Sequence, residues 1–177
     1  MSDFMKLSLT RQSCRNYSTQ PVEHEKLVQI IEAAHQSPSA CNSQPWSFVV
    51  AETPDVVSKI AVAAQQLGIN AFLSNAQAFV IILETHALLA PGIRKLIDSQ
   101  YFAKADCGGA TMSVCLAAAD LGLGSCIIGM FDREAITNAA GLPADTRFAS
   151  LIAIGYPADE TIREKKRKDL STIVKYV

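Results

Sequence analysis

The stretch AFVIIL, residues 78–83, decides the fold class because it is apolar at every position. A strand with one face in water alternates apolar and polar residues, whereas a strand that is apolar throughout is buried on both faces. Residues 46–51, 125–128 and 148–154 also have the length and composition of strands. We therefore expect one central sheet that is covered on both sides.

Helices are expected around these strands. Leu27, Ile30, Ile31 and Ala34 recur at i, i+3, i+4 and i+7, the spacing of one helical face. Further helices are predicted over residues 3–9, 53–66, 91–103, 106–121 and 132–141. The helix over 106–121 is rich in Ala, Gly and Ser, which indicates close packing against a partner helix or inside the domain. The order of elements predicts an α+β fold with one central sheet.

The composition excludes several classes of protein. The chain has 177 residues, of which 49% are hydrophobic and 19% charged, so we expect a single folded domain over residues 1–177 and no disorder. A net charge of −1 leaves no basic footprint for nucleic acid. No apolar run approaches the roughly 20 residues of a membrane span, and no secretory signal is expected, which favours a cytoplasmic protein. The apolar excess suggests a subunit interface.

Cysteine and histidine offer no metal site. The five cysteines lack a C-x-x-C pair and the three histidines stand apart, so we expect free thiols in a reducing cytosol and no bound metal. The chain also lacks a G-x-S-x-G elbow and a P-loop. Any chemistry must therefore be supplied by a bound cofactor.

Two polar segments in the first third of the chain are candidate binding sites. In RQSCR, residues 11–15, two guanidinium groups flank a hydroxyl, which suits a phosphate; the alternative is a solvated turn. In SPSACNSQPW, residues 37–46, two prolines stiffen a loop that presents Ser39, Asn42 and Gln44. Such a loop suits the edge of a flat heterocycle, the alternative being a plain helix-to-strand connection.

Two more candidate segments lie in the second half. GLGSCIIG, residues 122–129, is similar to a dinucleotide-binding fingerprint, but Ile127 stands where the third glycine belongs. Its glycines are better suited to end a helix and to let the backbone approach a ligand. The basic run KKRK, residues 165–168, is by itself typical of a solvated surface.

Taken together and in order, these segments resemble the FMN-dependent nitroreductase family. The similarity spans nearly the whole chain: R-x-S-x-R, P-S-x-x-N-x-Q-P-W, G-L-G-S-C-I-I-G, I-G-Y-P and a K-x-R tail. The resemblance implies a mostly antiparallel sheet of four to five strands flanked by helices, in an intertwined homodimer with FMN at the interface. It implies an NAD(P)H oxidoreductase that reduces nitroaromatics or quinones by ping-pong hydride transfer through flavin N5. NADH or NADPH would be the co-substrate.

The resemblance also assigns the residues that contact the phosphate end and one edge of the flavin. Arg11 and Ser13 match the positions that bind the FMN phosphate, and Lys165 and Arg167 match the tail positions that return to it. Arg15 matches a basic residue at the flavin N1/O2 edge, where it favours the reduced form. No side chain is expected to act as a catalytic acid or base; Arg15 and Gly129 tune the flavin.

Other matched positions surround the isoalloxazine ring. Pro38, Ser39 and Asn42 match a loop that reaches the ring from the partner subunit. The resemblance also implies that the C-terminal residues 170–177 of each copy cross onto the other. Ile128 and Gly129 match the segment whose backbone N–H faces N5.

Asn70 matches a ribityl or O2-edge contact less closely. Gly129 stands where some family members have Glu. The segment 83–106 is short, which predicts an open substrate channel, with Tyr101 and Phe102 near the flavin face.

The alternatives are a flavoenzyme of the same fold with other redox chemistry, such as dehalogenation or heterocycle oxidation, and a non-catalytic flavin-binding protein.

Overall fold

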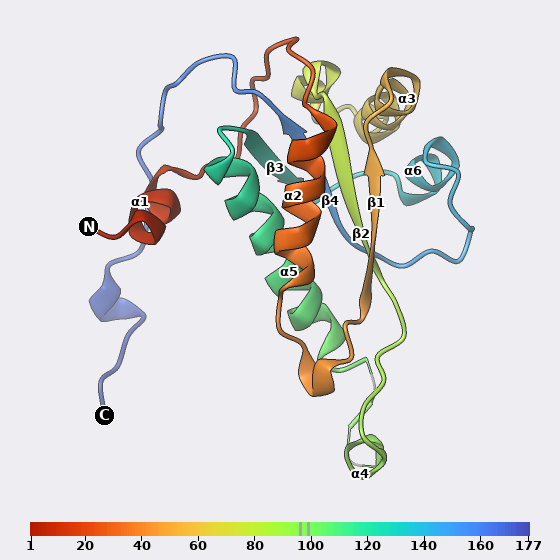
Figure 1. Cartoon of the computed structure of the whole chain (residues 1–177), viewed down its shortest axis with the longest axis vertical. Helices are drawn as coiled ribbons and strands as arrows, with labels where there is room; N and C mark the ends of the chain where they lie inside the picture. Colours follow the sequence, from red (N-terminus) through yellow and green to blue (C-terminus); the bar gives the residue numbers. More distant parts are fainter. Residues whose placement is uncertain (96, 99) are drawn as a thin grey trace.

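A four-stranded sheet forms the centre of the molecule (Figure 1). The structure is a computed structural model, and it describes residues 1–95, 97–98 and 100–177. The strands are β1 (Trp46–Ala51), β2 (Ala78–Glu84), β3 (Gly124–Ile128) and β4 (Phe148–Gly155). Their order is β1-β2-β4-β3, and each pair of neighbours is antiparallel. The α+β fold expected from the sequence is confirmed.

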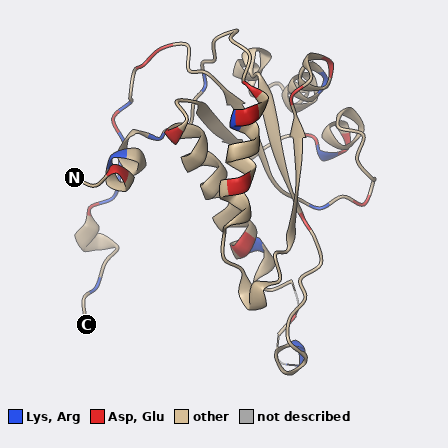
Figure 2. Cartoon of the chain, in the orientation of Figure 1, with Lys and Arg blue, Asp and Glu red and all other residues tan. Residues whose placement is uncertain are grey.

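Helices cover both faces of the sheet, as the apolar stretch 78–83 predicts. On one face, Phe79 and Ile81 of β2 pack in a core with α3 (Pro54–Gln65) and α6 (Arg133–Ala139). On the other face, Val80 and Ile82 share a core with α2 and α5. Those two helices span His24–His35 and Ala103–Asp120. Charged residues lie along the helices and loops (Figure 2), and Glu84 is the one charged residue in the strands.

Shorter elements complete the fold. They are α1 (Asp3–Thr10), η1 (Ala40–Asn42), η2 (Ala71–Asn75), α4 (Pro91–Arg94) and η3 (Leu170–Thr172). The chain leaves β4, runs past α1 and continues away from the sheet to the C-terminus (Figure 1). Among the described helices, none is long and apolar enough to cross a membrane.

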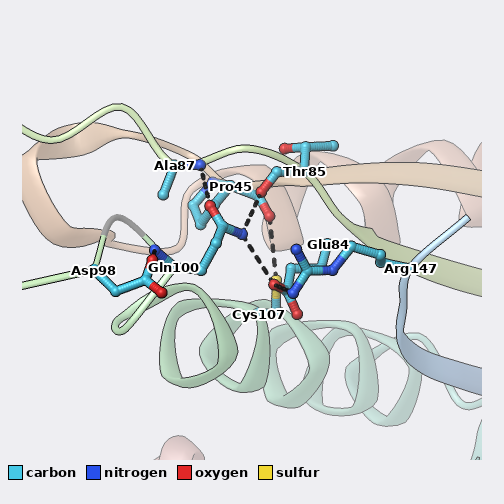
Figure 3. Close-up of polar contacts among 8 residues, drawn as sticks. All are labelled: Pro45, Glu84, Thr85, Ala87, Asp98, Gln100, Cys107 and Arg147. Atoms are coloured by element: carbon cyan, nitrogen blue, oxygen red, sulfur yellow. Dashed lines mark hydrogen bonds and ion pairs between the residues drawn. The ribbon is translucent and has the colours of Figure 1, made fainter. Parts of the chain in front are cut away.

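The helix predicted over residues 91–103 is wrong as a single element, because α4 ends at Arg94 and α5 begins at Ala103. Side chains in this connection bond to the backbone instead (Figure 3). The Asp98 carboxylate accepts a hydrogen bond from Gln100 N at 2.8 Å, and Gln100 Oε1 accepts from Ala87 N at 2.7 Å. Such bonds compete with helix formation. Residues 96 and 99 of the predicted helix lie outside the described residues.

The same glutamine fixes the connection to the end of β2 (Figure 3). Gln100 Nε2 donates to Glu84 Oε1 at 2.9 Å and to Thr85 O at 3.0 Å. The Glu84 side chain is only 6% exposed, and its charge is balanced by Arg147 Nη2 at 2.8 Å. A buried carboxylate needs such partners, so this cluster holds the 85–102 connection against the sheet.

Candidate functional site

The RQSCR segment lies along the free edge of β3. Ser13 forms a parallel bridge with Ser125, and Cys14 N donates to Ser125 O at 2.8 Å. A Cβ built on Gly124 would lie 2.6 Å from the Cβ of Cys14, so a larger residue at Gly124 would push this segment away from β3. Gly124 therefore admits the close approach of the chain's own Cys14, and it also lines the cavity described below. Gly122, at a φ of +76°, follows the end of α5 as expected.

Basic side chains gather where α1 ends. Lys165 Nζ donates to Ser8 O at 2.7 Å, which places the tail against α1 (Figure 2). Partial burial, and then the positive charges of Arg11 and Arg167, lower the pKa of Lys165. Within the described part of the chain, no carboxylate lies within 4.0 Å of these three side chains. Like charges held together without a counter-charge are unfavourable, so this basic cluster (Arg11, Lys165 and Arg167) fits an anion.

A cavity of about 560 Å³, a volume typical of sites for small molecules, reaches the basic cluster at Arg11, whereas Ser13, Lys165 and Arg167 lie outside its lining. Its lining includes Arg11, Arg15 and Arg163 together with Gly124 and Ser125. The chain after β4 closes the cavity with residues 157–163, which include the acidic Asp159 and Glu160. The cavity therefore combines cationic side chains with the start of β3, an arrangement that can hold an elongated anionic ligand.

The far end of β3 brings together the predicted residues Asn70, Ile128 and Gly129. Asn70 Nδ2 donates to Met130 O at 2.9 Å and to Ala64 O at 3.1 Å, so its amide nitrogen is used inside the protein. Ile128 is buried, whereas Gly129 is exposed, and a Cβ there would meet nothing within 4 Å. The backbone around Gly129 is thus accessible to a ligand.

The loop 38–42 lies elsewhere, at the beginning of α5. Asp106 accepts a hydrogen bond from Ala40 N at 3.1 Å, whereas Ala119 of the same helix lines the cavity. Thirteen residues of α-helix separate Asp106 from Ala119, or about 20 Å at 1.5 Å per residue. Within one chain, the structure does not bring Pro38, Ser39 and Asn42 together with the basic cluster.

The loop itself has an unusual backbone. Cys41, Asn42 and Gln44 have φ values of +54°, +52° and +46°, in the left-handed region that side chains disfavour. Ser39 Oγ accepts a hydrogen bond from Gln44 N at 2.9 Å and so fixes the turn from inside. Pro38 and Asn42 are exposed. Strain of this kind is typical of positions that bind or recognise another group.

A largely apolar face of α5 is exposed between these two regions. Ala105, Gly108, Gly109 and Met112 are exposed on it beside Lys104, and Met112 is 45% exposed. Large apolar residues of the tail are exposed as well: Leu170, Ile173, Tyr176 and Val177.

The sequence interpretation missed Arg163. It lines the cavity, and its guanidinium contacts Gln12 and Ser13, which lie between Arg11 and Cys14 in the first candidate segment. Only its spacing could have revealed it, because Arg163, Lys165 and Arg167 stand at every second position of the sequence.

Comparison with known proteins gives a consistent result. The model of the Nitroreductase family matches residues 9–68 and 54–156. A candidate NADH dehydrogenase/NAD(P)H nitroreductase of Archaeoglobus fulgidus is 32% identical over 164 residues, covering 90% of this chain and 88% of that protein. The FMN reductase (NAD(P)H) of Bacillus subtilis is 27% identical over 178 residues, covering 94% of this chain and 70% of that protein.

Solved structures share the fold. The crystal structure of a candidate nitroreductase of Exiguobacterium sibiricum in complex with FMN superimposes with a TM-score of 0.84 at 22% identity. The superposition covers 100% of this chain and 98% of that one.

Proposed function

Because this chain belongs to the Nitroreductase family, we propose that it is an FMN-dependent NAD(P)H oxidoreductase that reduces nitroaromatics or quinones. The observation that carries the proposal is the basic cluster beside a cavity at the start of β3, where the positive charges have no carboxylate partner in the described residues. A phosphate group supplies the missing negative charge.

The phosphate end of FMN is assigned to two segments that are far apart in sequence. Arg11, Lys165 and Arg167 would contribute the positive charges, and Ser13 would donate a hydroxyl hydrogen bond. In the described part of the chain the backbone oxygen of Ser13 accepts from Arg163 Nη2, whereas the Ser13 hydroxyl makes no hydrogen bond and is available. Charge-assisted bonds of this kind are roughly twice as strong as neutral ones.

The ring of FMN is assigned to residues along β3. When bound, FMN would supply the redox chemistry, which is the transfer of electrons from NADH or NADPH to a second substrate. Arg15 would hold a positive charge beside N1 and O2, where negative charge collects on reduction. The backbone of Ile128 and Gly129 would face N5, with Asn70 Oδ1 beside the ribityl chain or O2. No protein acid or base is assigned to the reaction.

A homodimer would complete the site. Two copies that pack through the exposed face of α5 about a two-fold axis perpendicular to this helix would have the two helices antiparallel, so that the start of one lies beside the end of the other. Pro38, Ser39 and Asn42 of one copy would then approach the basic cluster of its partner. The exposure of Met112 and of the apolar tail residues in the single chain supports such packing, because a partner would cover them. Four buried thiols suit a reducing cytoplasm.

The test is anaerobic reduction of the reconstituted protein. The chain is saturated with FMN, freed of excess ligand and mixed with NADH or NADPH while the flavin absorbance is followed. Loss of the yellow absorbance, and its return on adding a quinone, is the expected result. Flavin that dithionite reduces and neither nicotinamide reduces would instead indicate a flavin-binding protein without this activity.

A further inference from the structure

The geometry points to Gln12 and Arg163 as a pair of positioning residues, an inference that rests on the proposed function. We propose that they fasten the tail so that Lys165 and Arg167 meet the FMN phosphate together with Arg11. Neither residue would itself be a phosphate ligand. They would set the affinity for the phosphate group, and therefore the preference for FMN over riboflavin.

The Gln12 side chain binds both the backbone and the side chain of Arg163, and the Arg163 guanidinium also binds the backbone of Ser13. Gln12 Oε1 accepts hydrogen bonds from both N and Nε of Arg163, each at 3.1 Å. Arg163 Nη2 donates in turn to Ser13 O. Gln12 Nε2 donates to Thr161 O at 2.6 Å. Because oxygen accepts and nitrogen donates in every one of these bonds, the orientation of the Gln12 amide is fixed.

These bonds join the two segments that carry the proposed phosphate ligands. Gln12 lies between Arg11 and Ser13, so a change in its position moves both neighbours. Arg163 lies two residues before Lys165, so the position of Arg163 limits where Lys165 can reach. The pair therefore connects the N-terminal and C-terminal parts of the site across about 150 residues of sequence.

Beyond Arg163, the tail has little else to hold it. In the described structure, the hydrogen bond from Lys165 Nζ to Ser8 O is the one bond that links residues 164–177 to the rest of the chain. The remaining bonds of this segment are local, such as those that Ser171 N and Oγ donate to Asp169 Oδ1. Without the Gln12–Arg163 pair, two of the three charges in the basic cluster would depend on this single contact.

The guanidinium of Arg163 is also hydrogen-bonded within the protein, so it is not a free charge available to a ligand. Its Nε and Nη2 are engaged by Gln12 and Ser13 although Arg163 lines the cavity. A direct phosphate ligand would retain much of its effect as lysine, because lysine keeps the charge. A positioning arginine would not, because the lysine ammonium cannot reproduce the planar set of donors.

The experiment measures the affinities for FMN and for riboflavin, which lacks the phosphate, by quenching of flavin fluorescence. The variants are Gln12→Ala, Arg163→Lys and the double variant, with Arg94→Lys on exposed α4 as the matched control. We expect each single variant to weaken FMN binding by about tenfold and to leave riboflavin binding unchanged. The double variant should lose little more than either single one, since both break the same contact. Hydrogen exchange of residues 164–168 in the flavin-free protein should rise in both single variants.

Four results would overturn the pairing. FMN affinities that fall additively would show two independent contributions. Normal binding by Gln12→Ala, together with loss in Arg163→Ala that Arg163→Lys restores, would make Arg163 a direct ligand. An equal loss of riboflavin affinity would indicate damage to the whole site. A wild-type chain that binds neither flavin refutes the proposed function itself, whereas normal flavin binding by both variants refutes only the pairing.

Discussion

Substitution of Gly124 by alanine tests how the RQSCR segment is seated on β3. The new Cβ would lie 2.6 Å from Cys14 Cβ and 2.7 Å from Cys14 Sγ, whereas carbon atoms in contact stay about 3.5 Å apart or more. Cys14 or β3 must therefore move by about 1 Å. Overpacking of this kind costs about 1–3 kcal/mol, with roughly 1 kcal/mol more if the bond from Cys14 N to Ser125 O is lost.

The assay is urea unfolding combined with FMN titration. Gly124→Ala should lower the free energy of unfolding by about 1–3 kcal/mol. It should also weaken FMN binding by about tenfold, because Ser13 and Arg15 move with Cys14. Adding Cys14→Gly removes the overlapping atoms and should recover part of both losses. Gly92→Ala, whose Cβ would meet nothing within 4 Å, is the control. A Gly124→Ala protein as stable as the wild type would refute the proposed seating.

Three further predictions concern charge and thiols. Arg15→Ala should slow reduction of bound flavin by NADH or NADPH by about tenfold and lower the flavin potential, and an unchanged rate in stopped-flow measurements would contradict its assigned role. At pH 8, only Cys41 of the native chain should react quickly with a thiol reagent, because the other four cysteines are buried. For Cys107, burial raises the pKa to about 11, so that about one Cys107 side chain in a thousand is a thiolate at this pH. A second fast thiol would be inconsistent with this packing. Finally, bound phosphate should raise the pKa of Lys165, which is lowered in the flavin-free chain. The affinity for FMN should therefore fall as pH rises through that pKa, while the affinity for riboflavin stays level. Parallel pH curves for the two flavins would argue against phosphate binding by Lys165.

The sequence predicts those parts of the fold that depend on local patterns. The apolar run 78–83 forms a strand buried on both faces, and the spacing from Leu27 to Ala34 forms the buried side of α2. The prediction for residues 91–103 failed because Gln100 bonds to Glu84, Thr85 and Ala87, which lie 13–16 residues earlier. No helical periodicity reports such contacts.

The candidate site shows the same limit. Motif resemblance selected Arg11 and Lys165, and the structure brings them together. The role of Gly124 could not be predicted, because it depends on Cys14, which lies 110 residues away in the chain and becomes its neighbour only in the fold. Gln12 and Arg163 were missed for the same reason. Residue type indicates what a side chain can bind, but the partner is set by tertiary contacts.

The most direct test of the account asks whether one flavin site is built from the basic cluster of one copy and the 38–42 loop of another. Two double variants are co-expressed with different tags. One carries Arg11→Ala and Lys165→Ala, and the other carries Ser39→Ala and Asn42→Ala. The mixed dimer is isolated and assayed for NAD(P)H oxidation with a quinone. Each parent homodimer should be impaired at both sites. The mixed dimer should have one intact site and recover roughly half of the wild-type activity. A mixed dimer no more active than its parents would contradict the shared site.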